Sequence, residues 1–484
     1  MKVRTRFAPS PTGFMHVGNL RSALYAYLFA KKNKGDFILR IEDTDLEREV
    51  EGAIDVIYET LKESGFKIDE GPNEGGKFGP YIQSERKEIY LKYAEELIKK
   101  KTAYYCFCTK ERLASLKNDN GIARYDKKCL HLSEEEVKEN LKNKVPYVIR
   151  QNMPTEGVSS FTDLVFGEVS VPNNELEDHI LIKSDGLPTY NFANVIDDHL
   201  MEISHVMRGN EYLSSTPKYN LLYKAFGWQE PKYVHLTPIM RDETHKLSKR
   251  HGDANFIDFT TKGYLPEAIV NYIALLGWSP KGEQELFSLD ELISNFSLEG
   301  LSKSPSIFDE QKMKWINSEY IKKLSDEDFL KYALPYFEKS VVSGRFDFKL
   351  FVPILKSRIQ IFSDIIDMVK FVDEFNPLPI ENYENQKLKL DGVLAVKVLD
   401  SAILGLNDVT FTKESLDEFV KGLAETLGVK SGAVYTALRL GLTSLMVTPG
   451  GFSEIGLIFG KEETIRRLKQ SLLKLKGKEK ENGK

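Results

Sequence analysis

The chain has 484 residues, of which 41% are hydrophobic and 29% are charged, as in ordinary globular proteins, and its length predicts two to four domains. A formal net charge of -5, from 67 Lys and Arg against 72 Asp and Glu, neither indicates nor excludes a nucleic-acid partner, because phosphates respond to local basic patches. No signal peptide or membrane span is expected, and an odd count of three cysteines argues against a disulfide framework, so we expect a cytoplasmic protein.

The first hundred residues alternate between strand and helix patterns. Residues 2–7 and 36–41 are typical of strands, whereas residues 19–32 and 53–64 carry helical apolar stripes. This order of strand, loop, helix and strand predicts parallel pairing in an α/β fold of the Rossmann, nucleotide-binding type.

Residues 103–182 have a different character. They contain all three cysteines, a charged segment at 133–143 that is expected to be helical, and short β-like runs at 147–150 and 168–171. We interpret this region as an α+β insertion into the α/β domain.

The α/β pattern resumes over residues 188–236, and the chain becomes mainly helical after residue 242. Helical apolar periodicity is expected over residues 267–276, 329–337, 350–371 and 415–427. The Pro-containing segment 375–379 is interpreted as a linker.

The loop between the first expected strand and helix, residues 6–19, could receive an anion. A helix start presents backbone N–H groups and a positive dipole end, while Gly13 and Gly18 let a ligand approach the backbone. His16 could donate hydrogen bonds to phosphate oxygens there. A lone histidine at such a position is more often a cap or core residue.

A basic loop follows the strand-like run 233–240. Its sequence is His245-Lys246-Leu247-Ser248-Lys249-Arg250-His251. Mobile ammonium groups in such a turn suit a triphosphate and its leaving pyrophosphate. Taken alone, the loop is more often a solvated charged turn.

Together the two loops resemble the phosphate-binding pair of class I aminoacyl-tRNA synthetases. Here they read His16-Val17-Gly18-Asn19 and Lys246-Leu247-Ser248-Lys249-Arg250, with Asn19 where the superfamily has a histidine. Segments at residues 6–13, 40–45, 188–199 and 302–305 resemble the bacterial type of glutamyl-tRNA synthetase. The resemblance is strong over the N-terminal two-thirds and weak beyond.

The resemblance implies five regions. Residues 1–105 and 188–240 would form the two halves of the Rossmann catalytic domain, and residues 106–187 an insertion that holds the acceptor end of tRNA. Residues 241–325 would contact the tRNA stem and carry the basic loop, and residues 326–484 would form an all-helical anticodon-binding region.

It also implies a glutamate site. The expected residues are Arg6, Ala8, Ser10, Glu42, Tyr190 and Arg208. In the family, the two arginines serve the substrate carboxylates and Glu42 faces the ammonium group. A buried guanidinium binds a carboxylate through two parallel hydrogen bonds and would reject the neutral amide of glutamine. Asp43 and Asp45 are as well explained by capping.

By the same resemblance, His16, Lys246 and Lys249 are the expected catalytic residues. The ATP-binding residues would be Gly18, Glu211, Ile239, Lys246, Leu247, Ser248, Lys249 and Arg250. With Mg²⁺ shielding the phosphates, glutamate and ATP would form glutamyl-adenylate, and the glutamyl group would pass to the 3′ end of tRNA(Glu). tRNA(Gln) is a candidate second acceptor, and a monomer without a membrane partner is expected.

The cysteines and one histidine form a pattern of metal-ligand type. Cys106 and Cys108, followed by Cys129 and His131, would supply four ligands suited to tetrahedral Zn²⁺. Some family members carry such a structural zinc site. The alternative is three buried cysteines with no special role.

Three other functions share part of this pattern. A shortened relative that glutamylates a modified tRNA base would lack the long helical half, and a nucleotidyltransferase would not need the segments at 40–45 and 188–190. A non-catalytic tRNA-binding relative would not need both phosphate loops. Arg358 and Arg439 are candidates to read the anticodon, although a helix-surface salt bridge is the more usual role for either arginine.

Overall fold

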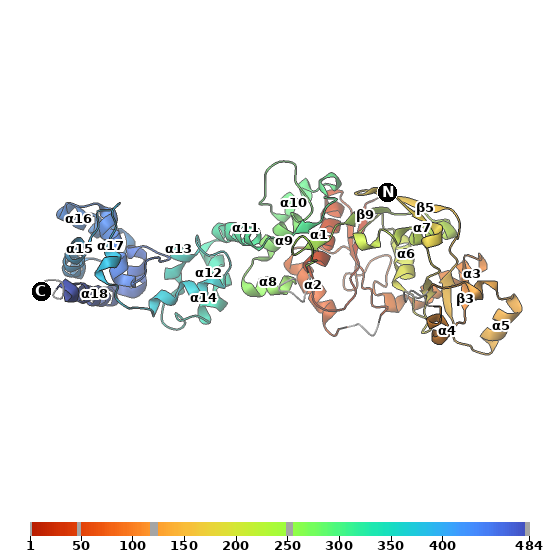
Figure 1. Cartoon of the computed structure of the whole chain (residues 1–484). Coiled ribbons are helices and arrows are strands. Elements are labelled where there is room, and N and C mark those ends of the chain that lie inside the picture. Colours follow the sequence, from red (N-terminus) through yellow and green to blue (C-terminus); the bar gives the residue numbers. More distant parts are fainter. Residues whose placement is uncertain (1, 46–49, 117–123, 248–254, 480–484) are drawn as a thin grey trace. The chain divides into compact units, whose positions relative to one another are not determined.

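The computed structural model describes residues 2–45, 50–116, 124–247 and 255–479. They form two compact units (Figure 1). Unit 1 contains residues 1–260 and 266–310, and unit 2 contains residues 261–265 and 311–484. Each unit is described separately below.

Unit 1 opens with the strand–helix alternation predicted from the sequence. Strand β1 (Arg4–Phe7) pairs in parallel with β2 (Asp36–Leu39), and helix α1 (Val17–Lys32) connects them. Helix α2 (Ala53–Glu63) follows. Because Leu20, Leu24 and Leu28 of α1 are fully buried, the predicted stripe is the face that covers this pair of strands.

Two further sheets complete the α/β part of unit 1. One has the order β3-β4-β7, with antiparallel pairs, and the other has the order β6-β5-β9-β8. The strands are β3 (Ala103–Cys106), β4 (Val148–Gln151), β5 (Val158–Asp163), β6 (Gly167–Pro172), β7 (Ile180–Ile182), β8 (His205–Gly209) and β9 (Lys232–Leu236). β5 and β6 come from the expected insertion, yet β5 pairs in parallel with β9. That insertion therefore contributes two strands to the sheet of β8 and β9.

The further helices of unit 1 in the described ranges are α3 (Lys87–Lys99), α4 (Lys110–Ala114), α5 (Glu134–Lys142), α6 (Tyr190–Leu200), α7 (Thr216–Phe226), α8 (Phe256–Lys262), α9 (Pro266–Ala274) and α10 (Leu289–Asn295). Of these, α3, α6 and α7 pack on the strands, whereas α9 and α10 pack on α1. α6 packs against α7, and α7 against β5 (Figure 1). Their apolar faces, including Phe192 and Leu222, bury a core shared with α3. Short strands β10 (Ile239–Met240) and β11 (Ser306–Ile307) pair in parallel near the end of the unit.

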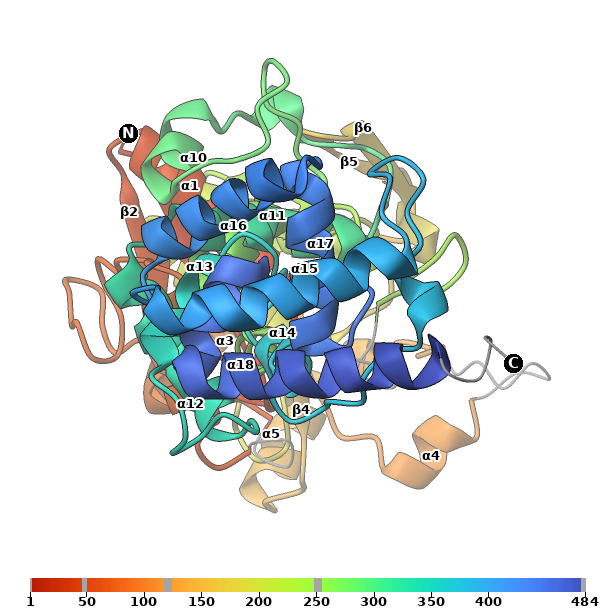
Figure 2. The ribbon, with the colours of Figure 1, turned by 90° about the vertical axis from the view of Figure 1, so that its left-hand side faces the viewer.

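Unit 2 is helical, as predicted. Its helices are α11 (Glu310–Lys323), α12 (Asp326–Glu338), α13 (Val352–Leu355), α14 (Asp364–Met368), α15 (Gly392–Gly405), α16 (Lys413–Leu427), α17 (Ser431–Thr443) and α18 (Phe452–Glu479). Helices α15 to α18 pack together as a bundle (Figure 2). The expected continuous periodicity over 350–371 is instead broken into α13, α14 and single 3₁₀ turns. None of the helices in the described ranges is long and apolar enough to cross a membrane.

Candidate active site

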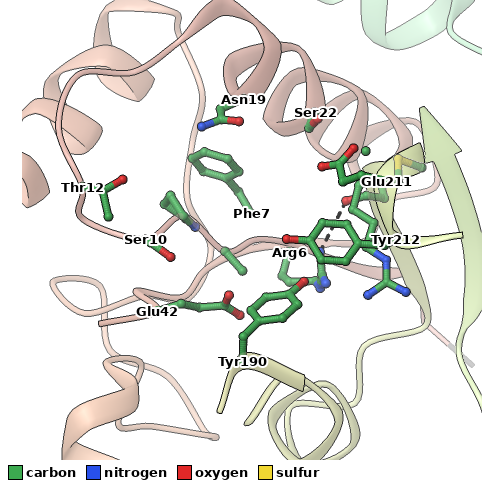
Figure 3. Close-up of a pocket in the computed structure, with 15 residues that line it drawn as sticks. Arg6, Phe7, Ser10, Thr12, Asn19, Ser22, Glu42, Tyr190, Glu211 and Tyr212 are labelled. Carbon is green, nitrogen blue, oxygen red and sulfur yellow. Dashed lines mark hydrogen bonds between the residues drawn. The ribbon is translucent and has the colours of Figure 1, made fainter. Parts of the chain in front are cut away.

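A cavity of about 310 Å³ lies where β1 and β8 end. Ligands of open α/β sheets bind at this carboxyl edge of parallel strands. The cavity is lined by Arg6, Phe7, Ala8, Pro9, Ser10, Thr12, Asn19, Ser22, Glu42, Tyr190, Met207, Arg208, Gly209, Glu211 and Tyr212 (Figure 3). All six residues that were expected to bind glutamate are therefore brought to one cavity, although they lie up to about 200 positions apart in the sequence.

The first cavity arginine, Arg6, is held by a carboxylate. Its Nε lies 3.1 Å and its Nη2 3.4 Å from the two carboxyl oxygens of Asp198. Asp198 also accepts a 2.7 Å hydrogen bond from Nη1 of Arg40, and Arg40 donates to Glu42 at 2.9 Å. Burial opposes ionisation of Asp198, but the guanidinium groups of Arg6 and Arg40 outweigh it and lower the pKa of this carboxyl.

Glu42 points into the cavity opposite Tyr190 (Figure 3). Its carboxylate is 3% exposed, and Arg40 is fully buried behind it. Burial raises the pKa of Glu42, while the charges of Arg40 and Arg6 counteract that rise. The next residue, Asp43, does what capping residues do: it accepts hydrogen bonds from the backbone N–H and hydroxyl of Ser84.

The second cavity arginine, Arg208, sits among aromatic rings. Its guanidinium carbon lies 4.9 Å from the ring centre of Tyr212, 4.8 Å from that of Tyr219 and 5.6 Å from that of Tyr233. The side chain lies at the end of β8 and is 6% exposed. Tyrosine faces stabilise a desolvated cation without carrying a negative charge of their own.

The loop at residues 6–19 leads into α1 as expected. His16 is the N-cap of α1, and its Nδ1 accepts a 3.0 Å hydrogen bond from the backbone N–H of Gly18. A Cβ atom at Gly18 would lie only 3.2 Å from that nitrogen, so glycine suits this close approach. The capping interpretation of His16 is thus confirmed.

The basic loop is only partly described. Ser248, Lys249 and Arg250 lie outside the described residues. Before them, the backbone N–H of Arg241 donates to the carbonyl of His245 and closes a turn. Within the turn, the backbone N–H groups of residues 244 and 245 donate to the carboxylate of Asp242. The N–H of Leu247 then donates to the carbonyl of Ile239. Lys246 is exposed. Of the expected ATP residues within the described ranges, only Glu211 lines the cavity; Gly18, Ile239, Lys246 and Leu247 do not.

The three cysteines of the insertion lie together. The Sγ atoms of Cys106, Cys108 and Cys129 are all within 4.8 Å of one another. The structure does not bring His131 into this group; the histidine is exposed. The Tyr125 hydroxyl, which sequence analysis missed, lies 3.4 Å from the Cys106 sulfur and 3.8 Å from the Cys108 sulfur. The insertion thus offers three sulfur ligands, which fit three of the four positions of a tetrahedral Zn²⁺ site.

In unit 2, the two candidate anticodon arginines bond to the backbone. Arg358 donates to the carbonyl of Ile354, and Arg439 donates to that of Leu445. Neither forms an ion pair with a carboxylate of the described residues. The simple salt-bridge explanation therefore finds no support at either position.

Comparison with known families and proteins gives a consistent result over the whole chain. Residues 2–315 match the family described as "tRNA synthetases class I (E and Q), catalytic domain", and residues 310–472 match the family "Anticodon binding domain". The second match coincides with the helical unit 2.

Relatives that match over nearly the whole chain agree with these family matches. The chain is 54% identical over 479 residues to the glutamate–tRNA ligase of Clostridium novyi (strain NT), with 98% of each chain covered. The glutamate–tRNA ligase of Clostridium kluyveri is 54% identical over 480 residues, again with 98% of each covered. A crystal structure of the glutamate tRNA ligase from Elizabethkingia meningosepticum, in complex with its amino acid, superposes with a TM-score of 0.86 at 37% identity, covering 98% of this chain and 100% of that one. The chain therefore belongs to the glutamate–tRNA ligases, a family of class I aminoacyl-tRNA synthetases.

Proposed function

We propose that the cavity at the ends of β1 and β8 is the glutamate site of this ligase. The observation that carries the proposal is that the six residues expected to bind glutamate converge on a single cavity. Two buried guanidinium groups and one buried carboxylate in so small a space suit a ligand with two carboxylates and one ammonium group.

In this proposal each charged group has its own role. Arg208 and Arg6 receive the substrate carboxylates, and Glu42 faces the ammonium group. Glutamine would place an amide N–H against a guanidinium N–H and leave a buried charge unpaired, which costs about 10⁴-fold or more in comparable sites. Ala8, Ser10 and Tyr190 complete the wall that positions the substrate.

ATP would bind beside this cavity, at the start of α1. An oxygen of the glutamate α-carboxylate attacks the α-phosphorus, the bond to the β-phosphate breaks, and pyrophosphate leaves glutamyl-adenylate behind. His16, Lys246 and Lys249 would hold phosphate oxygens as charge moves onto the pyrophosphate. Mg²⁺ bound with ATP would supply further charge neutralisation. Gly18, Leu247, Ser248 and Arg250 would complete the phosphate loops, with Ile239 beside adenine and Glu211 beside the ribose.

In the second step a terminal ribose hydroxyl of tRNA attacks the activated carbonyl, and AMP leaves. tRNA(Glu) is the proposed acceptor, with tRNA(Gln) as the second candidate. We expect a monomer in which the insertion receives the acceptor end and unit 2 the anticodon.

We also propose a structural zinc site in the insertion. Cys106, Cys108 and Cys129 would hold the ion. The nearby oxygen of Tyr125 would be the fourth donor. His131 is the alternative fourth ligand. Such a site would tie the end of β3 to the turn at 128–131, and none of its residues lines the glutamate cavity.

The test is ATP–pyrophosphate exchange and aminoacylation by the purified chain, with tRNA(Glu) and tRNA(Gln) side by side. Glutamate should be charged, and glutamine and aspartate should not. Lys249→Ala should lower exchange by at least about 10²-fold, as for loss of one charge-stabilising group, and the exposed Lys339→Ala in unit 2 is its control. Normal exchange by Lys249→Ala would refute the phosphate role, and charging of glutamine would refute the glutamate site.

A further inference from the structure

A buried histidine stands directly behind Arg208. His235 lies on β9, where the parallel register pairs it with Arg208 on β8. Its side chain is completely buried. Nε2 of His235 lies 3.2 Å from Nε of Arg208, and Nδ1 lies 2.7 Å from a carboxyl oxygen of Asp163. The three side chains thus form a hydrogen-bonded chain that leads from Asp163, at the end of β5, to Arg208 in the cavity.

The geometry fixes the protonation of His235. Nε of Arg208 carries only a donor hydrogen, so Nε2 of His235 must offer its lone pair, and the ring proton must sit on Nδ1, facing Asp163. Asp163 is itself held by the backbone N–H groups of Val165 and Phe166. Burial also lowers the pKa of His235, which favours the same neutral ring.

The two cavity arginines therefore differ in charge balance. Arg6 is paired with the carboxylate of Asp198. Arg208 instead donates to the neutral ring of His235 and to the hydroxyl of Thr216, at 2.8 Å. Within the described part of the chain, no carboxylate forms an ion pair with Arg208. Neutral groups thus orient the Arg208 guanidinium, and its positive charge remains available to a ligand.

We propose that His235 is a positioning residue for glutamate specificity: as a neutral acceptor oriented by Asp163, it fixes the Arg208 guanidinium without cancelling its charge. A carboxylate in its place would hold Arg208 as firmly but would compete with the substrate carboxylate. A missing acceptor would let the guanidinium turn away. This inference rests on the proposed role of Arg208 in binding glutamate.

Two substitutions separate the two hydrogen bonds of the ring. In His235→Gln, the amide oxygen can reach the Nε2 position and accept from Arg208. In His235→Asn, the shorter amide can reach only the Nδ1 position, so it keeps the bond to Asp163 and loses the one to Arg208. His205→Asn, a buried histidine of β8 bonded to Ser204 outside the cavity, is the matched control.

The measurement is the KM for glutamate and for ATP in tRNA-supported ATP–pyrophosphate exchange, with inhibition by glutamine measured in parallel. We expect His235→Asn to raise the KM for glutamate about tenfold, the order of one lost hydrogen bond to a charged group, and to weaken the preference for glutamate over glutamine. His235→Gln should stay within about threefold of the parent, and the KM for ATP should change little in either variant. Thermal unfolding shows whether each variant is folded.

The inference predicts a higher glutamate KM for His235→Asn than for His235→Gln, an order that a purely structural role of His235 gives no reason to expect. Equal glutamate KM values for the two variants, or a higher value for His235→Gln, would overturn the inference. Arg208→Lys separates this failure from failure of the glutamate site. If Arg208→Lys keeps the parent KM for glutamate, the proposed role of Arg208 is wrong. If Arg208→Lys raises that KM but His235→Asn does not, only the role of His235 is wrong.

Discussion

The two arginines of the cavity carry the same charge but have different partners. Arg6 and Arg208 are both buried arginines at strand ends, yet Asp198 pairs with the first and His235 faces the second. Asp198 bridges Arg6 and Arg40, and Arg40 in turn holds Glu42. Removing one member of such a buried set leaves an uncompensated charge, which costs more than the intact pair contributes.

Asp198→Asn tests this at the residue scale. The amide keeps the shape of the side chain but removes the negative charge between two buried guanidinium groups, so we expect the free energy of unfolding to fall by about 3 kcal/mol. Urea unfolding of unit 1 measures the change. Glu96→Gln, which breaks a half-exposed pair between Glu96 of α3 and its C-cap residue Lys100, should change the free energy of unfolding by less than about 1 kcal/mol. Equal effects of the two substitutions would show that burial of the network matters little.

Much of the cavity could be predicted from the sequence, because the segments that carry its residues resemble a known family. Arg6 and Arg208 lie at the ends of strands, and Tyr190 begins α6. His235 and Asp163 could not be predicted, since no local pattern indicates that residues 72 positions apart meet across a parallel register. Tyr125 was missed for a similar reason: its hydroxyl reaches the cysteines from four residues before Cys129, outside any metal-ligand spacing.

At the element scale, periodicity located several helices but assigned no range to α15, α17 or α18. α1, α12 and α16 lie where their apolar stripes placed them. The run 350–371 carries enough buried apolar residues for one helix, but the loop 357–363 folds back so that Gly263 accepts a hydrogen bond from Phe362. Tertiary contact with a distant loop overrides local propensity there.

The proposed zinc site would connect two elements, because it joins β3 to the turn at 128–131. Tyr125→Phe removes the oxygen donor, so we expect bound zinc to fall from about one equivalent to below about half, as for loss of one ligand. His131→Gln is the matched control and should keep its zinc if Tyr125 is the fourth ligand. Metal analysis by mass spectrometry measures both, and hydrogen exchange over residues 103–132 should quicken only in Tyr125→Phe.

The reverse result, zinc lost in His131→Gln and kept in Tyr125→Phe, would make His131 the ligand. Zinc below about half an equivalent in the parent protein, purified without chelator, would argue against any zinc site.

At the scale of the whole molecule, the two units differ in how they should respond to acid. All eight histidines lie between His16 and His251, within unit 1, and unit 2 has none. Burial lowers the pKa of His179 to about 3 and that of His205 to about 4. Both ring nitrogens of His179 are enclosed, without a hydrogen-bond partner among the described residues.

We therefore predict that unit 1 alone loses stability between pH 7 and pH 5. An unfolded histidine titrates near 6.5, so below that pH the unfolded chain binds protons that the folded unit 1 refuses, and the free energy of unfolding falls. His179 accounts for about 2 kcal/mol at pH 5. Glu42 and Glu230, whose pKa values burial raises, offset part of the loss.

Urea unfolding read by pulsed hydrogen exchange and peptide mass analysis follows both units in one sample, with unit 2 as the internal control. His179→Phe should flatten the pH dependence of unit 1 and leave unit 2 unchanged; equal acid sensitivity of both units would contradict the assignment to histidines.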